Sequence, residues 1–128
     1  IAKAKLNPLK LKVGVFGLTF KENCPDMRNT QVKNIVEKLK LTVGNISITD
    51  PYAYPDEVKS LFDIELSPLN KITNLDIVIL AVSHDEYKKI KLKEWLNIFN
   101  NKEGIFIDIK SVFEKDYFIN SKIKHWRL

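Results

Sequence analysis

The chain has 128 residues, of which 45% are hydrophobic and 29% are charged, and its formal net charge is +5. This length fits one ordinary domain, so we expect residues 1–128 to form a single domain with 1–11 as a lead-in. No apolar run approaches the roughly 18–20 residues that a membrane span needs, so we expect no membrane span. The chain begins with Ile1 and has no signal-peptide pattern, so we expect a piece, or a processed product, of a longer protein.

Charge and cysteine content also exclude several classes of partner. The single cysteine, Cys24, cannot form an internal disulfide, which fits the cytoplasm as the expected location. His84 and His125 lie far from Cys24 and from each other, so we expect no metal site. The basic residues are spread along the chain, with one group at 88–93, and we expect no nucleic-acid partner. A diphosphate, by contrast, needs only two or three well-placed cations.

The first half of the chain alternates between apolar runs and helical patterns, as α/β proteins do. The continuous apolar run at 12–18 predicts a strand that is buried on both faces. A helical pattern follows from Thr30, and either Asn29 or Thr30 can cap this helix. The next strand is predicted at 45–50, and a short helix at 55–62 begins with a proline.

The second half continues this alternation. The segment 62–66 predicts a small edge strand, and 75–83 is the clearest buried strand in the chain. One or two short helices are predicted within 86–99, followed by a strand at 104–110. The tail is predicted to be helical at 112–118, ahead of an aromatic end.

These elements predict an α/β fold, with a Rossmann-like open, mostly parallel sheet of about five or six strands and helices on both faces. The segments between strands are long enough for right-handed crossovers, which parallel strands require. Ligands of such sheets bind beyond the carboxyl ends of the strands. The segments that follow the strands are therefore where a site is expected.

The segment 19–29 follows the first strand and is long for a connection between a strand and a helix. Lys21 offers a compact positive charge and Arg28 a planar set of donors, which suit phosphate or carboxylate groups. The helix that starts near Thr30 adds the positive end of its dipole. Asp26 could orient Arg28 or cap that helix. A solvated loop with local ion pairs remains the alternative.

Two other nucleotide or phosphate sites fit the sequence poorly. Gly14 and Gly17 do not complete the G-x-G-x-x-G fingerprint of a dinucleotide site, although Asp50 ends the second strand, where a ribose-binding acid would lie. Asp50 and Lys110 are also placed as in a phospho-acceptor receiver domain. Such a domain needs an acidic pair after its first strand, and residues 19–21 are Thr, Phe and Lys.

Cys24 and His84 are the two side chains with nucleophile or base chemistry in these segments. Cys24 lies between Lys21 and Arg28, which would favour a reactive thiolate, but the adjacent Pro25 favours a role in a turn. His84 follows the third long strand and could act as a general base. We favour a structural role for His84 as the cap of the helix that follows.

The segment GLTFKENCPDMRNTQV resembles the start of the C-terminal, UDP-binding domain of the UDP-glucose/GDP-mannose dehydrogenase family. Within that family it looks closest to the branch that oxidises UDP-N-acetylhexosamines for capsule or O-antigen polysaccharides. The Phe-Lys signature is matched at 20–21, and the Asp-x-Arg-Asn/Ser-Thr/Ser signature at 26–30. TDPYA, LAVSHDEY and FIDIKSVF are further matches, and the resemblance covers residues 12–128.

This resemblance implies a homodimeric, three-part enzyme with an N-terminal NAD-binding domain, a helical middle that dimerises, and this domain. Such enzymes use two NAD to oxidise the C6 alcohol of a UDP-sugar to a carboxylate. The catalytic thiol of the family would lie outside this chain, and so would most of the NAD site. We therefore expect no catalytic residue here and no activity from the chain alone.

The resemblance also assigns roles to particular residues. Phe20 and Lys21 would contact the nucleotide sugar, and Arg28 would reach toward NAD. Lys110 would touch the substrate of the partner subunit. Many relatives have Arg at that position, and with Lys the bidentate contact is lost.

Two functions of other classes remain open at this point. The domain could act as a stand-alone nucleotide- or polyanion-binding module without catalysis. It could also serve mainly in assembly, with Trp95, Trp126 and the lysine-rich stretch at an interface.

Overall fold

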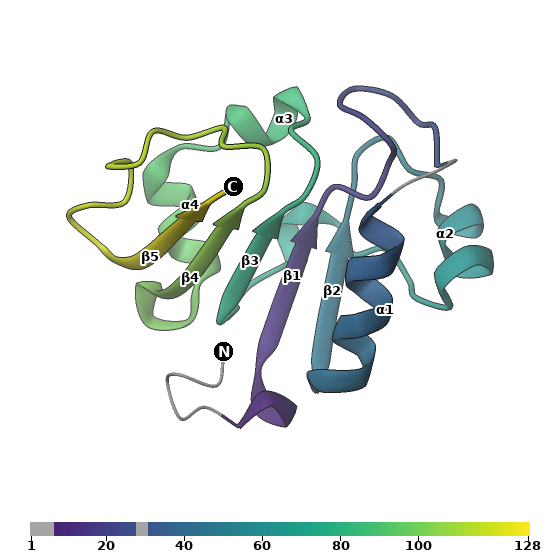
Figure 1. Ribbon diagram of the computed structural model, residues 1–128, viewed down its shortest axis with the longest axis horizontal. Helices are drawn as coiled ribbons and strands as arrows, with labels where there is room; N and C mark the ends of the chain where they lie inside the picture. Colours follow the sequence, from purple (N-terminus) through teal and green to yellow (C-terminus); the bar gives the residue numbers. More distant parts are fainter. Residues whose placement is uncertain (1–6, 28–30) are drawn as a thin grey trace.

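The computed structural model describes residues 7–27 and 31–128, and its centre is one sheet of five parallel strands (Figure 1). The strand order is β2-β1-β3-β4-β5. Successive connections therefore run in opposite directions on either side of the boundary between β1 and β3, which makes this boundary the topological switch point. The strands are β1 Lys12–Phe16, β2 Asn45–Thr49, β3 Ile77–Leu80, β4 Glu103–Asp108 and β5 Lys122–Arg127.

Helices cover parts of both faces of this sheet. In Figure 1, α1 lies in front of β1 and β2, whereas α4 lies behind the other half of the sheet. The Rossmann-like α/β fold predicted from the sequence is thereby confirmed. No helix in the described part of the chain is both long and apolar enough to cross a membrane. The helices are α1 Val32–Thr42, α2 Pro55–Phe62, α3 Asp85–Lys88 and α4 Leu92–Ile98, with short 3-10 helices at Pro8–Lys10, Leu69–Lys71 and Asn100–Lys102.

Two apolar clusters hold the helices to the sheet. On one face, Val13 and Val15 of β1 pack in a cluster with Val36 of α1. On the other face, Phe16 packs against Trp95 of α4, with ring centroids 5.3 Å apart. Neighbouring side chains of a strand point to opposite faces, so the short continuous apolar run of β1 is buried on both sides.

Most of the predicted elements are present. The helix predicted at 55–62 has those same bounds, and Pro55 occupies its first turn. The segment 86–99 forms two short helices. The edge strand predicted at 62–66 is reduced to a single bridge between Leu66 and Ile48. The two capping candidates of the first helix, Asn29 and Thr30, lie outside the described residues.

The prediction for the tail was wrong. Residues 112–118 form turns and bends instead of a helix, and the unpredicted strand β5 follows. The carboxylate of Asp108 accepts hydrogen bonds from the backbone N–H groups of Val112 and Phe113, at 2.9 Å each. Ser111 has a φ of 52°, in the left-handed region. These local bonds compete with a helical path, so the chain turns back toward β4.

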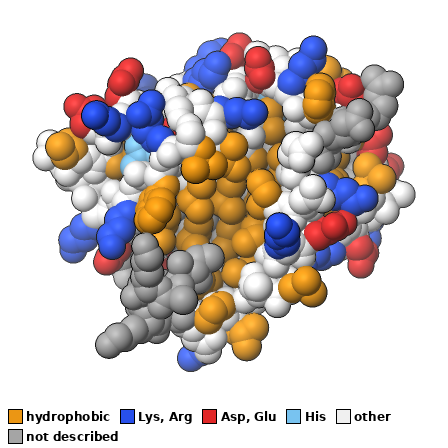
Figure 2. Space-filling model, in the orientation of Figure 1, with side chains coloured by type: hydrophobic (Ala, Val, Ile, Leu, Met, Phe, Trp, Pro, Cys, Tyr) orange, Lys and Arg blue, Asp and Glu red, His pale blue; other side chains and the backbone are white. Residues whose placement is uncertain are grey.

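One face of the sheet is only partly covered by the described residues. Figure 2 shows hydrophobic side chains gathered in the middle of the face on which α1 lies. Ile105, Ile107 and Ile109 are partly buried there, and Trp126, which pairs with Ile107 across β4 and β5, is 52% exposed. Parallel sheets are normally covered on both faces, so this apolar face is unusual for a free surface.

Candidate functional site

A hollow of about 290 Å³ lies at the carboxyl ends of the strands, beside the switch point between β1 and β3. Four segments form its wall: the loop after β1, the first turns of α1, and the segments that follow β3 and β4. Ligands of open parallel sheets bind at this place. The lining residues are Thr19, Phe20, Gln31, Val32, Ile35, Ala81, Val82, Ile109 and Lys110.

The hollow brings together two of the four predicted site residues. Phe20, which is 52% exposed, and Lys110 both line it, although they are far apart in the sequence. Lys21 follows Phe20 directly and is exposed, but it is not part of the wall. Arg28 lies outside the described residues. Sequence reasoning missed Gln31, for which the only signal was its place at the start of the predicted helix.

Gly17 allows the chain to leave β1 close to the end of β3. Its φ of 97° lies in the region that favours glycine, and a Cβ there would lie 2.6 Å from Cβ of Val82. Real side chains do not approach that closely. The glycine therefore fixes how the loop that carries Phe20 begins, and it serves packing instead of a phosphate turn.

Asp50 lies at the end of β2 and has its carboxylate fully engaged. The residue is 7% exposed, and its two oxygens accept hydrogen bonds from four backbone N–H groups and one imidazole. A carboxylate bound in this way is not available to a ribose or to a phosphoryl group, so neither alternative raised for Asp50 fits. The donors are Leu18, Thr19, Tyr52, Ala53 and Nε2 of His84.

The same bonds set the charge state of Asp50. Burial raises the pKa of its carboxyl group, but hydrogen bonds from His84 and from the backbone of Leu18 and Tyr52 lower it. The net effect holds the pKa of Asp50 below its ordinary value of 3.8. The carboxylate is therefore ionised at neutral pH, where it can accept all of its hydrogen bonds.

His84 is buried, and both of its ring nitrogens are hydrogen-bonded. Nε2 lies 2.9 Å from Oδ2 of Asp50, and Nδ1 lies 2.8 Å from the backbone nitrogen of Asn23. His84 is thus not available as a general base. It occupies the N-cap position of α3 but makes no capping bond with its side chain. The cap comes from Asn23, whose Oδ1 accepts from the backbone N–H of Asp85 at 3.0 Å.

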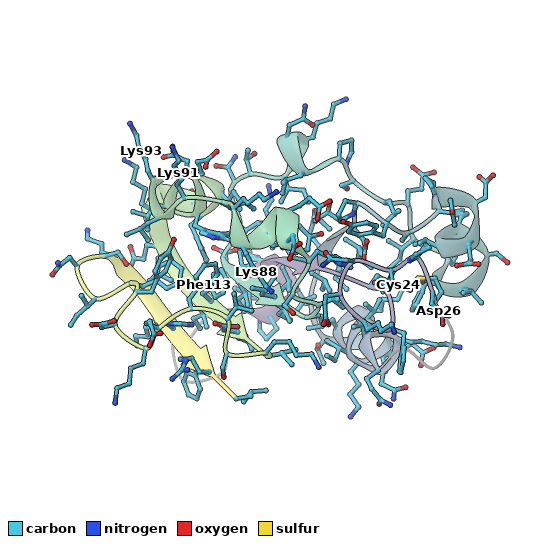
Figure 3. All side chains as sticks on the ribbon, turned by 90° about the horizontal axis from the view of Figure 1, so that it is seen from above. Cys24, Asp26, Lys88, Lys91, Lys93 and Phe113 are labelled. Carbon is cyan, nitrogen blue, oxygen red and sulfur yellow. The ribbon has the colours of Figure 1, made fainter. Side chains whose placement is uncertain are left out.

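Lys91 and Lys93 of the lysine-rich stretch lie away from the loop after β1, whereas Lys88 lies nearer the middle of the strand ends (Figure 3). Figure 3 looks down on the strand ends and shows Cys24 and Asp26 on the side of α2, with Lys91 and Lys93 at the opposite end, by α4. Cys24 is a partly buried free cysteine. Among the described residues, no group of three or more His, Cys, Asp and Glu side chains is placed to hold a metal ion.

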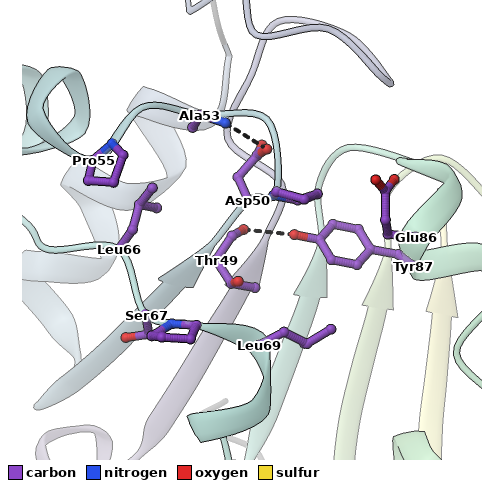
Figure 4. Close-up of a pocket in the computed structure, with 11 residues that line it drawn as sticks. Thr49, Asp50, Ala53, Pro55, Leu66, Ser67, Leu69, Glu86 and Tyr87 are labelled. Atoms are coloured by element: carbon purple, nitrogen blue, oxygen red, sulfur yellow. Dashed lines mark hydrogen bonds between the residues drawn. The ribbon is translucent and has the colours of Figure 1, made fainter.

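A second hollow, of about 360 Å³, lies beyond the end of β2 (Figure 4). Its wall is mostly apolar, with Pro55 and Leu66 on one side and Tyr87 on the other, and the Tyr87 hydroxyl donates to the carbonyl of Thr49 at 2.9 Å. Its charged lining residues are the acids Asp50 and Glu86. Negative charge disfavours an anionic ligand, so the hollow that contains Lys110 is the candidate site.

Comparison with known proteins identifies a family for this chain. The family model for the UDP-binding domain of the UDP-glucose/GDP-mannose dehydrogenase family matches residues 14–115. Protein CapL of Staphylococcus aureus is 40% identical over 116 residues, which cover 91% of this chain and 27% of CapL. The UDP-N-acetyl-D-glucosamine 6-dehydrogenase of Salmonella typhi is 31% identical over 110 residues, covering 86% of this chain and 26% of that enzyme.

Solved structures share the fold. The structure of an NDP-N-acetyl-D-galactosaminuronic acid dehydrogenase from Methanosarcina mazei Go1 superposes with a TM-score of 0.83 at 21% identity. It covers 98% of this chain and 26% of its own chain. The chain therefore spans about a quarter of the length of the relatives that it matches.

Proposed function

The chain belongs to the UDP-glucose/GDP-mannose dehydrogenase family, and we propose that it is the C-terminal part that binds the nucleotide sugar in an NAD-dependent UDP-sugar 6-dehydrogenase. The parent enzyme would oxidise a UDP-N-acetylhexosamine or UDP-glucose to the uronic acid, for capsule or O-antigen polysaccharide. One observation carries this proposal: Phe20 and Lys110 meet in a single hollow beside the start of α1.

The chemistry of this hollow suits a nucleoside diphosphate. The ammonium group of Lys110 and the positive end of the α1 dipole would stabilise the two phosphates. Lys21, which is exposed and follows Phe20 in the same loop, would add a second cation. The exposed ring of Phe20 offers an apolar surface on which a ribose or a base can pack.

The oxidation itself would be completed by other parts of the parent enzyme. In the parent enzyme, two successive hydride transfers from C6, each to one NAD, would convert the alcohol to a carboxylate, and water would supply the second oxygen. The engaged carboxylate of Asp50 supports an NAD site that lies mainly elsewhere. The resemblance implies that Arg28, which lies outside the described residues, would contact the cofactor. The catalytic thiol would also come from outside this chain, so the chain alone would be inactive.

The partly covered sheet face supports this dependence on a longer protein. We propose that residues 1–128 form one domain and that the rest of the parent covers the apolar surface around Ile105 and Ile107. The parent would act as a homodimer in the cytoplasm, where UDP-sugars and NAD are available. Lys110 lies in the same hollow as Phe20, so it would contact the nucleotide sugar of its own subunit, in place of the partner subunit's substrate that the resemblance implies.

Kinetics of the full-length parent enzyme test this function. Lys21→Ala removes the exposed cation that follows Phe20 in the loop, and loss of a charge-assisted contact of about 1.5–3 kcal/mol would raise KM for the UDP-sugar roughly tenfold or more. KM for NAD should stay within about twofold. Lys93→Ala, at the distant end by α4, is the matched control and should change neither value. Unchanged sugar kinetics in Lys21→Ala would defeat the proposal.

A further inference from the structure

Three loops at the functional edge are joined through one buried pair of side chains, Asp50 and His84. Asp50 follows β2, and His84 lies between β3 and α3. Oδ2 of Asp50 accepts from the backbone N–H of Leu18 at 2.7 Å and of Thr19 at 3.1 Å. These donors belong to the loop after β1, immediately before Phe20.

His84 binds the other end of this part of the loop, at Asn23. The backbone N–H of Asn23 can only donate, so Nδ1 of His84 must be the acceptor of their 2.8 Å bond. The ring proton is then on Nε2, which donates to Asp50 at 2.9 Å. His84 therefore links Asn23 to the carboxylate of Asp50. The same carboxylate accepts hydrogen bonds from the backbone of Leu18 and Thr19.

Phe20 and Lys21 thus lie between two anchored positions. Within the loop, the hydroxyl of Thr19 donates to the carbonyl of Lys21 at 3.1 Å, and the N–H of Phe20 donates to the carbonyl of Asp26 at 2.7 Å. Asn23 has a φ of 58°, in the left-handed region, which asparagine adopts more readily than most residues other than glycine. The bonds from the buried pair end on loop backbone, so they determine loop position directly.

We propose that Asp50 and His84 are positioning residues that hold Phe20 and Lys21 in place for the nucleotide sugar. This inference rests on the proposed function of the hollow. The pair touches no substrate itself and acts through the backbone of residues 18–23. Its loss should therefore weaken binding of the UDP-sugar more than it affects NAD.

Two substitutions in the full-length enzyme each remove one half of the link. His84→Asn keeps an acceptor near the position of Nδ1 and loses the donor to Asp50. His84→Gln keeps a donor near the position of Nε2 and loses the acceptor for Asn23. For each variant we expect KM for the UDP-sugar to rise about fivefold to tenfold, with KM for NAD unchanged.

Tyr87→Phe is the matched control for a loss of stability alone. It removes the buried hydrogen bond to the carbonyl of Thr49, beside His84. The Tyr87 hydroxyl also interacts with the backbone of Gly17, which precedes the anchored residues 18–23. We expect a lower Tm with an unchanged KM for the UDP-sugar. If the His84 variants behave like Tyr87→Phe, or raise both KM values equally, the positioning role is overturned.

Two further measurements distinguish failure of the positioning role of Asp50 and His84 from failure of the proposed function. Lys21→Ala tests the proposed function. If Lys21→Ala and the His84 variants all leave KM for the UDP-sugar unchanged, the proposed function fails. If Lys21→Ala raises this KM but the His84 variants do not, only the positioning role is refuted. If the His84 variants do not fold, hydrogen exchange of the wild-type enzyme decides. Protection of the Asn23 amide supports the link, and exchange at the rate of an open loop contradicts it.

Discussion

Nε2 of His84 lies 2.9 Å from Oδ2 of Asp50, and both side chains are fully shielded from solvent. The backbone N–H of Asn23 occupies the other ring nitrogen, so each polar atom of the imidazole has a partner. The pair connects the ends of β2 and β3 to the loop after β1. A buried, fully hydrogen-bonded network of this kind specifies one loop arrangement, because its alternatives leave polar groups without partners.

The tautomer of His84 can be measured directly. Because Asn23 donates to Nδ1, we expect a neutral ring with its proton on Nε2 at neutral pH. The ¹⁵N chemical shifts of the ring, from a long-range ¹H–¹⁵N correlation spectrum, should show one protonated and one unprotonated nitrogen, with Nδ1 the latter. A proton on Nδ1, or a charged ring, would contradict the hydrogen-bond arrangement.

Asp50→Asn should destabilise the fold in a pH-dependent way. The amide cannot accept bonds at both positions, and leaving buried donors unpaired costs about 2–3 kcal/mol at neutral pH. The pKa of Asp50 is lowered in the folded state, so the charge contributes stability above the ordinary value of 3.8, and this contribution is lost as pH falls through the folded pKa. Denaturation of the chain across pH measures the difference.

The comparison with wild type gives the sign of this effect. The gap in unfolding free energy should be largest near pH 7. It should shrink below about pH 4, where Asp50 of the unfolded chain takes up a proton, and continue to shrink until the pH passes the lower folded pKa. A gap that is constant across this range would show that the charge of Asp50 contributes nothing to stability.

The two tryptophans provide a matched test of the core. Trp95 is fully buried and packs edge-on against Phe106 at 4.9 Å, whereas Trp126 is 52% exposed. Nε1 of Trp95 has no hydrogen-bond partner among the described residues, so its contribution comes from packing. Trp95→Ala should cost about 3–5 kcal/mol of unfolding free energy and Trp126→Ala less than about 1. Equal losses on chemical denaturation would contradict the assignment of the two faces. Because Trp95 is buried in the core, its side chain is not available at the surface for the assembly role considered from the sequence.

Lys110 should act through its charge at the hollow. In the parent enzyme, Lys110→Ala is expected to raise KM for the UDP-sugar about tenfold, because a charge-assisted contact to phosphate is lost. Lys110→Arg keeps the charge and should remain within about threefold of wild type. If the alanine and arginine variants have the same steady-state KM, the role of the charge is refuted.

The fold was largely predictable because its signals are local. The run at 12–18 and the proline at the start of 55–62 each predict an element from neighbouring residues alone, and both predictions are confirmed. The helix predicted at 112–118 was wrong because Phe113 and Tyr117, four residues apart, have the spacing of a helical pair. They do stack, at 4.5 Å, but on a turn held by Asp108. Strand β5 carries a period-two pattern, with Ile123 and His125 inward, that could have identified it.

The site was predictable only in part, for a physical reason. That the segments after the strands meet at one edge follows from parallel topology, and this brings Phe20 and Lys110 into one hollow. The link between Asp50 and His84 joins residues on different strands through side-chain geometry, and no local pattern encodes it. The sequence therefore predicted the edge of the sheet where the candidate site lies, but not the side chains that hold its loop.

The most direct test of the account is a crystal structure of the parent enzyme with UDP bound. We predict density for the nucleotide in the hollow at the ends of β1, β3 and β4, with a phosphate oxygen within hydrogen-bond distance of Lys110 and the ring of Phe20 against the nucleoside. UDP seated instead in the hollow between Pro55 and Tyr87, or away from this domain altogether, would contradict it.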